Sequence, residues 1–345
     1  MRQTATLVLG LLFLASSGRA ADVCPGDCDG DREVTIDEIV RGIGIVFNPE
    51  ALSECAAMDP DSDGRVTVAE ILQQVNAALE GCPLSTTACN GADELCSRRY
   101  DQVSYPTTHN AMANADDGWV GPNQTHDVAR QLRDGVRALM LDTHPYLDGV
   151  YLCHSDCAFF GHRRLAETLT DIRAFLDQHP REVVTIIFEA YVSAAQTEGA
   201  FVESGLLDYV HVQPLDQPWP TLHEMIASGK RLVVFSDNDR GARPWYHYVW
   251  DYAFETNFSY EKPQDLSCAT NRGDPSHSLF ILNHFLTRGV GHINLARLIN
   301  YNPLFADRAL QCQEQDERLP NFVTVDFYNV GDLFQVVSTL NGLDS

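Results

Sequence analysis

From about residue 100 onward, short apolar runs alternate with stretches of helical periodicity, and this alternation constrains the fold more than any other feature. Helical patterns lie between several runs, for instance at residues 165–176 and 222–227. The runs span residues 136–141, 150–152, 183–188, 209–212, 232–235, 279–282 and 322–325, with a weaker first member at residues 103–106. Eight strands alternating with helices predict a TIM-type (β/α)8 barrel, for which about 250 residues are typical. An open doubly wound sheet ranks second, because no Gly-rich phosphate loop follows an early strand.

Polar side chains stand where these predicted strands end. In a barrel of this kind the chemistry gathers at the carboxyl ends of the strands. The residues are His109 and Asn110 after the first strand, Asp142 and His144 after the second, His154 after the third, Glu189 after the fourth, Asp237 after the sixth, and Asp326 in the eighth. A lone histidine at a strand end is more often structural, so it is the convergence of these positions that favours a reaction centre.

The first 20 residues have the pattern of a secretory signal peptide: Arg2, an apolar run at residues 6–15, and small residues around a cleavage site at residues 18–20. The apolar run is too short to span a bilayer. Ten cysteines fit an oxidising compartment. We therefore expect a secreted protein, extracellular or periplasmic. The local spacing favours two disulfides, Cys153 with Cys157 and, less strongly, Cys89 with Cys96; the remaining pairing stays open.

Residues 21–82 hold an internal repeat of two acidic loops. Each loop places oxygen-bearing side chains at positions 1, 3, 5, 9 and 12, which is the spacing of an EF-hand calcium loop. The candidate Ca²⁺ ligands are Asp27, Asp29, Asp31, Thr35 and Glu38 in the first loop and Asp59, Asp61, Asp63, Thr67 and Glu70 in the second. The sixth position needs a left-handed turn; Gly64 stands there in the second loop but Arg32 in the first, so we expect weaker binding in the first. An acidic turn without metal is the alternative.

The paired loops resemble a dockerin-like calcium module. The resulting domain prediction is a signal peptide at residues 1–20, this module at residues 21–82, a linker at residues 83–98 and the barrel at residues 99–345. In dockerins such a module binds another protein, but the sequence does not identify a partner here.

The formal net charge is −24, with 48 acidic residues against 24 basic ones. Nucleic-acid binding is therefore excluded as a working hypothesis, because contacts with phosphates need clustered cations. An acidic surface is also not drawn toward anionic lipid, although it allows transient contact with a membrane.

Several motifs in order along the chain resemble the X domain of phosphatidylinositol-specific phospholipase C, in particular the plant and bacterial X-domain-containing proteins. They lie at residues 107–111, 135–142, 152–155, 183–189, 219–220, 231–235 and 321–328. The likeness covers roughly residues 88–342. It implies a phosphodiesterase that acts on a phospholipid or glycolipid, with an inositol-type head group.

The resemblance also implies the mechanism. A hydroxyl of the head group attacks its own phosphodiester and yields a cyclic phosphate. By position, His109 matches the histidine that acts as the base and His154 the one that acts as the acid, and histidine suits both roles because its pKa lies near neutrality. Asp326 is expected to orient His109, as the carboxylate does in a catalytic triad.

In calcium-dependent members of this family, an Asn, a pair of carboxylates and a Glu hold the metal. Asn110, Asp142 and Glu189 match those positions, whereas Met140 stands where the first carboxylate of the pair belongs. The resemblance thus predicts an active-site cation at Asn110, Asp142 and Glu189, and the alternative is a hydrogen-bond network without metal. Asn110 and Arg137 are the candidates for contact with the phosphate.

Two other functions stay open. A glycerophosphodiester phosphodiesterase has a similar barrel and usually a Glu-x-Asp pair, which Met140 breaks here. A catalytically idle protein that binds calcium and docks to a surface is the second. Less informative are an aromatic run at residues 245–258, for which packing is favoured over contact with lipid or sugar, and His126 and His144, which could lie near the barrel mouth.

Overall fold

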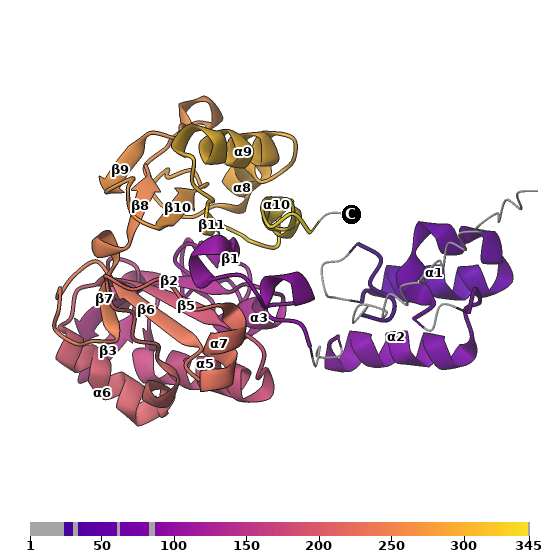
Figure 1. Ribbon diagram of the computed structural model, residues 1–345, viewed down its shortest axis with the longest axis horizontal. Coiled ribbons are helices and arrows are strands. Elements are labelled where there is room, and N and C mark those ends of the chain that lie inside the picture. The colour runs from indigo at the N-terminus through magenta and orange to yellow at the C-terminus, as the bar shows by residue number, and fades with distance from the viewer. Residues whose placement is uncertain (1–23, 30–33, 61–62, 83–86, 344–345) are drawn as a thin grey trace, which may run out of the picture. The chain divides into compact units, whose positions relative to one another are not determined.

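The computed structural model describes residues 24–29, 34–60, 63–82 and 87–343 (Figure 1). The chain forms two compact units, residues 1–83 and residues 84–345. The predicted signal peptide and the predicted ligands Asp31 and Asp61 lie outside the described residues.

Two helices and two short 3-10 helices make up the described part of the N-terminal unit. They are α1 (Ile36–Phe47), η1 (Pro49–Glu54), η2 (Ala56–Met58) and α2 (Val68–Glu80). Thr35 and Glu38 form a capping box at the start of α1, and Thr67 and Glu70 form the same box at α2. Each box satisfies backbone N–H groups that a helix start leaves unpaired. The two predicted loops therefore lead into equivalent helix starts.

The N-terminal unit has a small core and two disulfides. Cys24 pairs with Cys82 and Cys28 with Cys55. Met58 is fully buried in this core, in a cluster that includes Ile45 of α1 and Cys55. A unit of this size buries too little apolar surface to be very stable alone, so cross-links matter to it.

The second unit is built on eight parallel strands. They are β1 (Tyr105–Thr108), β2 (Ala138–Tyr146), β5 (Val184–Ala190), β6 (Leu232–Ser236), β7 (Tyr246–Tyr248), β8 (Ala253–Thr256), β10 (Leu279–Asn283) and β11 (Phe322–Val325). Their order in the sheet is β7-β6-β5-β2-β1-β11-β10-β8. This is the order of a TIM-type barrel, because each strand pairs with the parallel strands that precede and follow it. Within the described strands, β7 and β8 share no ladder, so the barrel is open between them.

Helices cover the outside of this sheet, as α5, α6 and α7 show in Figure 1. The α-helices are α3 (Val128–Arg133), α4 (Cys157–Phe160), α5 (Leu165–Gln178), α6 (Ala194–Ser204), α7 (Leu222–Ser228), α8 (Ile293–Ile299), α9 (Leu304–Asp316) and α10 (Leu333–Leu340). Short 3-10 helices are η3 (Asp93–Leu95), η4 (Tyr100–Gln102), η5 (Leu206–Tyr209), η6 (Val249–Asp251) and η7 (Pro263–Asp265). No helix in the described part of the chain is long and apolar enough to cross a bilayer.

Side chains alternate between two cores along each barrel strand. One set packs under the outer helices, as Leu139 and Ile186 do. The other set, which includes Ala138, Ile187 and Phe322, fills the barrel interior. Continuing the interior set by steps of two reaches polar residues at the carboxyl end of the strands: His109, Asp142, Glu189, Asp237 and Asp326. The strand period thus aims these side chains into the barrel mouth.

Two of the predicted barrel strands are wrong. Residues 150–152 belong to β3 (Gly149–Leu152), which pairs antiparallel with β2 and then with β4 (Arg163–Arg164), so this run forms a hairpin rather than a barrel strand. Residues 209–212 form no strand: η5 ends at Tyr209 and a single bridge joins Val210 to Leu232.

The true strands in their place, β7 and β8, lie in the aromatic run. They are short and only η6 separates them, so no helical period marks the boundary between them. Tyr246 and Phe254 are buried, as the packing interpretation of the run expects. An extra strand, β9 (Thr270–Gly273), pairs antiparallel with β8.

Part of the predicted linker packs with the barrel unit. Cys89 and Leu95 are buried in the cluster that fills the barrel interior. Cys89 also forms the predicted disulfide with Cys96. The segment from residue 87 onward is therefore folded against the barrel.

Candidate active site

His109 and Asp326 follow neighbouring parallel strands. Thr108 on β1 pairs with Val325 on β11, so the next residue of each strand lies beside the other. His109 Nδ1 lies 2.8 Å from Asp326 Oδ1. The imidazole stacks on Phe285, with ring centroids 3.9 Å apart. The carboxylate and the aromatic ring together fix the plane of the imidazole. Nδ1 is engaged by Asp326, so Nε2 is the ring nitrogen that can contact a substrate.

Asn123 holds the same carboxylate from the other side. Its Nδ2 donates to Asp326 Oδ1 at 3.1 Å and to Oδ2 at 3.2 Å. Both residues are buried. These hydrogen bonds hold the Asp326 carboxylate in place beside the imidazole of His109.

A hairpin brings His154 to the mouth. β3 runs back along β2, and Cys153 N donates to Asp142 O at 3.3 Å. The predicted disulfide between Cys153 and Cys157 closes the turn that carries His154. As a result, His154 Nδ1 lies 3.0 Å from Asp142 Oδ2. His154 therefore reaches the site from a hairpin and not from the end of a third barrel strand.

The contact with Asp142 raises the pKa of His154, because the hydrogen bond and the negative charge favour the imidazolium, although partial burial opposes the shift. Burial also raises the pKa of Asp142, and its hydrogen bond with His154 offsets part of that rise. His154 consequently holds a proton to higher pH than an ordinary histidine would.

The Asn110 amide lies between the two histidine–carboxylate pairs. With its oxygen toward His154, it accepts from Nδ1 at 3.2 Å and its nitrogen donates to Asp142 at 3.2 and 3.3 Å. In the opposite orientation, Nδ2 donates to Asn123 Oδ1 at 3.3 Å. Asn110 is 3 % exposed. Its amide thus lies within hydrogen-bond distance of the Asp142–His154 pair in one orientation and of Asn123 in the other.

Left-handed backbone accompanies these residues. Asn110 has φ 45°, Ser155 next to His154 has φ 66°, and Phe327 next to Asp326 has φ 51°. For residues other than glycine this region costs on the order of 1 kcal/mol or more, and such residues cluster at functional sites. Each of these three left-handed residues adjoins a predicted catalytic residue, which is consistent with a functional site at the barrel mouth.

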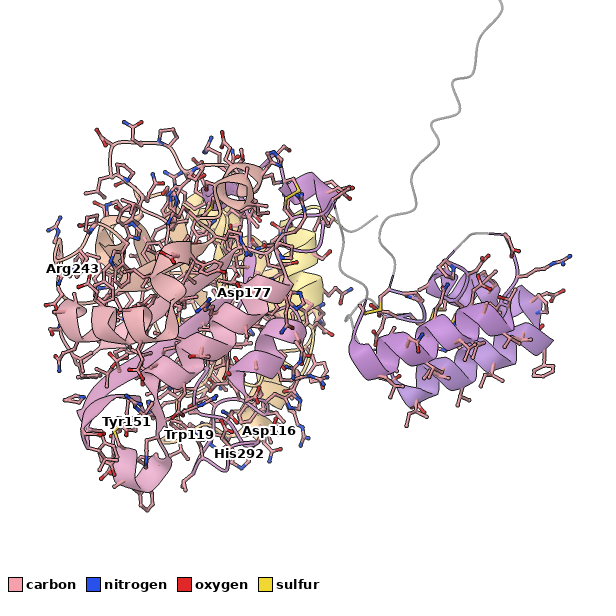
Figure 2. All side chains as sticks on the ribbon, turned by 90° about the horizontal axis from the view of Figure 1, so that it is seen from below. Asp116, Trp119, Tyr151, Asp177, Arg243 and His292 are labelled. Carbon is pink, nitrogen blue, oxygen red and sulfur yellow. A yellow bond between two sulfur atoms is a disulfide. The ribbon has the colours of Figure 1, made fainter. Side chains whose placement is uncertain are left out.

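A cavity of about 360 Å³ opens at the barrel mouth. His109, Asn110, Asp142 and Glu189 line it, whereas His154 does not. Other labelled residues follow different strands: Trp119 follows β1, Tyr151 lies in β3, and His292 follows β10. Figure 2 shows these three residues toward one end of the barrel unit.

Two predicted site residues, Glu189 and Arg137, do not take part in the hydrogen bonds between the histidines and their carboxylates. Glu189 is exposed and accepts a hydrogen bond from the Tyr191 hydroxyl. Arg137 is 4 % exposed, and its Nε donates to Glu182 at 2.6 Å. Its Nη1 donates to two backbone carbonyls at the base of the sheet. Arg137 is not among the residues that line the cavity, so its predicted phosphate contact has no geometric basis.

Arg272 is the cation that the sequence interpretation missed. It lines the cavity from β9, and its guanidinium lies 4.5 Å from the Trp250 ring centroid and 4.6 Å from that of Phe258. Its Nε lies 2.5 Å from Glu255 Oε1. Nothing in the sequence flags Arg272, because it stands on an exposed antiparallel strand outside the predicted barrel. Asn123 and Phe285 lie in loops and were missed for the same reason.

His126 and His144 are the two other histidines considered for the barrel mouth, and each contacts a neighbouring side chain. His126 Nδ1 lies 2.9 Å from Asp116, and His144 stacks on Tyr191 with centroids 4.3 Å apart. Neither lines the cavity.

Several of the described candidate ligands of the N-terminal loops lie close together. The ligand atoms of Asp27, Asp29 and Glu38 lie within 4.8 Å of one another. In the second loop, Asp59 accepts from the backbone N–H of Asp63 at 3.1 Å and of Gly64 at 2.7 Å.

Glu70, at the last position of the second loop, is 5 % exposed, and its buried Oε1 has no hydrogen-bond partner among the described residues. A buried carboxylate oxygen without a partner is costly unless a cation meets it, so the donor set fits Ca²⁺.

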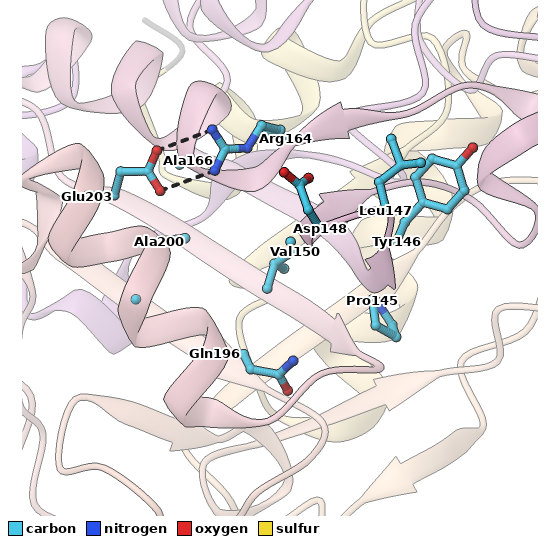
Figure 3. Close-up of a pocket in the computed structure, with 12 residues that line it drawn as sticks. Pro145, Tyr146, Leu147, Asp148, Val150, Arg164, Ala166, Gln196, Ala200 and Glu203 are labelled. Carbon is cyan, nitrogen blue, oxygen red and sulfur yellow. Dashed lines mark hydrogen bonds and ion pairs between the residues drawn. The ribbon is translucent and has the colours of Figure 1, made fainter.

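A second hollow of about 700 Å³ lies between the β2–β3 hairpin and α6 (Figure 3). An ion pair between Arg164 and Glu203 stands at its edge. None of the predicted site residues lines it. We assign it no chemistry.

A protein-family model described as PI-PLC X matches residues 95–341, which is most of the barrel unit. The chain belongs to the PI-PLC X domain family. A PI-PLC X domain-containing protein 1 from the fungus Arthroderma benhamiae is 32 % identical over 282 residues, covering 74 % of this chain and 90 % of that protein. An uncharacterized secreted protein from the same fungus is 31 % identical over 333 residues, covering 87 % of this chain and 73 % of that protein.

Solved structures of the phosphatidylinositol-specific phospholipase C from Staphylococcus aureus have the same fold. One, of a mutant, matches with a TM-score of 0.51 at 14 % identity and covers 72 % of this chain and 95 % of that one. Another has a TM-score of 0.50 at 15 % identity, covering 71 % and 94 %. At these identities they support the TIM-type barrel, and the family supports a phospholipase C-like protein. The five disulfides and the secreted relative agree with the predicted extracellular location.

Proposed function

We propose that this chain is a phosphodiesterase of the phospholipase C type that cleaves its substrate with His109 and His154. The observation that carries the proposal is the pair of histidine–carboxylate contacts, His109 with Asp326 and His154 with Asp142, at the mouth of one barrel. Family membership and fold support the same reaction class.

His109 suits the role of base. Asp326 accepts from Nδ1–H and so favours the tautomer in which Nε2 is free to take a proton. Nε2 removes the proton of a head-group hydroxyl, and that oxygen forms a bond to phosphorus. The ester bond to the leaving oxygen breaks, and His154, whose pKa the contact with Asp142 raises, gives that oxygen a proton. The product is a cyclic phosphate and a free alcohol.

A cation at Asn110, Asp142 and Glu189 stays a prediction, and the donor set fits it poorly. Asp142 is already engaged by His154, and Glu189 accepts from Tyr191. The three side chains would supply about half of the six or more oxygens that Ca²⁺ needs. We therefore derive no step of the reaction through a metal.

The substrate class comes from the family alone. The resemblance to phosphatidylinositol-specific enzymes points to an inositol-type phospholipid or glycolipid, reached during transient contact with a membrane. A glycerophosphodiester phosphodiesterase is the alternative. The products separate the two: a cyclic inositol phosphate supports the first reaction, and glycerol phosphate supports the second.

Substitution of the two histidines tests the proposal. With phosphatidylinositol as substrate, His109→Ala and His154→Ala should each lower kcat on the order of 10²- to 10⁴-fold. His223→Ala, on the exposed face of α7, is the matched control and should retain activity. Unchanged cleavage in both active-site variants would overturn the mechanism and favour a catalytically idle interaction protein.

We further propose that the N-terminal unit binds Ca²⁺ through its two loops. Two observations support this. Glu70 Oε1 meets no hydrogen-bond partner within the described part of the chain, and the ligand atoms of Asp27, Asp29 and Glu38 lie close together. Calorimetric titration should detect Ca²⁺ binding that Glu70→Gln weakens. An identical titration curve for that variant would contradict a calcium site in the second loop. The module's protein partner is not identified by any of these features.

A further inference from the structure

The loop that follows β1 folds back onto the strand end that carries His109. Within this loop, Asn123 is 5 % exposed and Gln124 is fully buried. The backbone N–H groups of both residues donate to the carbonyl of Ala113, at 2.8 and 3.0 Å. Neither residue is among those that line the cavity. Buried amide side chains are costly unless they are hydrogen-bonded, so their partners indicate what they hold in place.

Gln124 joins the backbones of the two strands that carry the base and its carboxylate. The β1–β11 ladder ends at the pair Thr108 and Val325, and His109 N then donates to Val325 O at 3.0 Å. Gln124 Nε2 donates to His109 O at 2.8 Å and to Val325 O at 3.1 Å. Its Oε1 accepts from Tyr328 N at 3.1 Å. The Gln124 side chain therefore continues the connection between the two strands past the end of the ladder.

Asn123 holds the carboxylate itself. Its Nδ2 donates to both oxygens of Asp326, at 3.1 and 3.2 Å. Its backbone carbonyl accepts from Phe327 N at 2.8 Å, directly after Asp326. Because both carboxylate oxygens are engaged, the carboxylate is hindered from turning about its Cβ–Cγ bond. Oδ1 of Asp326 is thereby kept at 2.8 Å from His109 Nδ1.

A third loop packs against this segment. Gly291 follows β10, and a Cβ atom at that position would lie 2.4 Å from Pro122 O and 2.9 Å from the Asn123 Cα. Side chains almost never approach a backbone so closely, so glycine lets the two loops meet there. Asn123 is thus enclosed by the loops that follow β1, β10 and β11. A residue enclosed in this way holds its partners in one arrangement before a substrate binds.

We propose that Asn123 and Gln124 are positioning residues for the base, which hold His109 and Asp326 in a fixed mutual arrangement without contacting the substrate. Gln124 sets the spacing of the two backbones, and Asn123 sets the direction of the carboxylate. The inference rests on the proposed function, because this arrangement matters to cleavage only if His109 takes the proton. Loss of either amide should lower kcat without weakening substrate binding, since a misplaced base affects the transition state.

Steady-state cleavage of phosphatidylinositol by the full chain tests this inference. Asn123→Ala should lower kcat on the order of tenfold to a hundredfold and leave KM nearly unchanged. Asn123→Asp fills the same space without an N–H donor for Asp326, and it should lose at least as much. Asn341→Ala is the matched control, because Asn341 is 3 % exposed and its amide forms hydrogen bonds of 2.9 and 3.0 Å with the backbone of Ser104, at the amino end of β1. It should keep kcat even where its unfolding temperature falls as far as that of Asn123→Ala.

A double-variant cycle separates positioning from general support of the fold. Asn123→Ala acts through Asp326, so adding it to Asp326→Asn should cost little further kcat. Gln124→Met keeps the length of the side chain but removes its hydrogen bonds, and it should lower kcat by itself. Full kcat in a folded Asn123 or Gln124 variant, or losses that multiply in the double variant, would overturn the inference while the proposed function stands. If His109→Ala and Asp326→Asn also cleave at the full rate, the proposed function fails, and this inference fails with it.

Discussion

At the scale of single residues, the two histidines of this site are made different by their surroundings. His109 lies between a buried carboxylate and an aromatic ring, and the hydrogen bond with Asp142 raises the pKa of His154. Similar side chains in different environments are how one site holds a base and an acid at the same pH. The division of roles therefore lies in the neighbours, and the neighbours are what substitutions should address.

Removing the charge of Asp326 tests the orientation of the base. Asp326→Asn would place an amide where Nδ1–H now finds an acceptor, so the imidazole loses its preferred tautomer. We expect kcat to fall on the order of 10²- to 10⁴-fold with a smaller change in KM. Steady-state kinetics checks this, with Asp307→Asn on the outer helix α9 as the control. A change in KM alone would contradict the role.

Removing the charge of Asp142 tests the acid through its pH dependence. The hydrogen bond with Asp142 raises the pKa of His154, so the protonated form persists to higher pH. In Asp142→Asn that pKa should fall, and the alkaline limb of the kcat/KM profile should move to lower pH. The profile measured between pH 5 and pH 9 reports the shift. An alkaline limb that stays in place would mean that His154 is not the acid.

At the scale of secondary structure elements, the β2–β3 hairpin is the device that completes the site. His109, Asp142 and Asp326 point into the barrel mouth because side chains alternate between the two faces of a strand. His154 lies at the mouth only because β3 folds back along β2. The Cys153–Cys157 disulfide closes its turn.

Loss of that disulfide should impair activity more than stability. It closes a very short loop, so it removes little entropy from the unfolded chain. It does hold the segment that carries His154, and small displacements of a catalytic group are costly. We expect Cys153→Ser with Cys157→Ser to lower kcat about tenfold or more. The pair Cys89→Ser with Cys96→Ser, also a short loop, should leave kcat near its original value, and equal losses in both would contradict this view.

The sequence predicts the elements whose pattern is local. The barrel class, the interior direction of the strand-end residues and two disulfides follow from periodicity and spacing. The β2–β3 hairpin could not be predicted, because an apolar run has the same pattern whether its strand pairs parallel or antiparallel. The boundary between β7 and β8 could not be predicted either, because a strand of three residues is too short to show a period. Arg137 was misjudged for a similar reason: the sequence places it just before β2 but cannot show that Glu182 takes its charge. Arg272 and Asn123 meet the site only through the fold.

At the scale of the whole molecule, the two units are separable by their cross-links. Cys24, Cys28, Cys55 and Cys82 pair among themselves, and the other six cysteines pair within the barrel unit. Deleting residues 22–82 would leave no unpaired cysteine. We expect that variant to keep the kcat of the full chain and to lose Ca²⁺ binding, and a chelator should not slow it. Loss of cleavage on deletion would show that the barrel site depends on the N-terminal unit.

The measurement that tests the central claim most directly is phosphorus NMR of the products from phosphatidylinositol. Transfer to a neighbouring hydroxyl, with His109 as base and His154 as acid, predicts a cyclic inositol phosphate signal that appears first and is absent with either histidine replaced by alanine. A first product that is an acyclic phosphate, or a cyclic one formed equally well by both variants, would contradict the account.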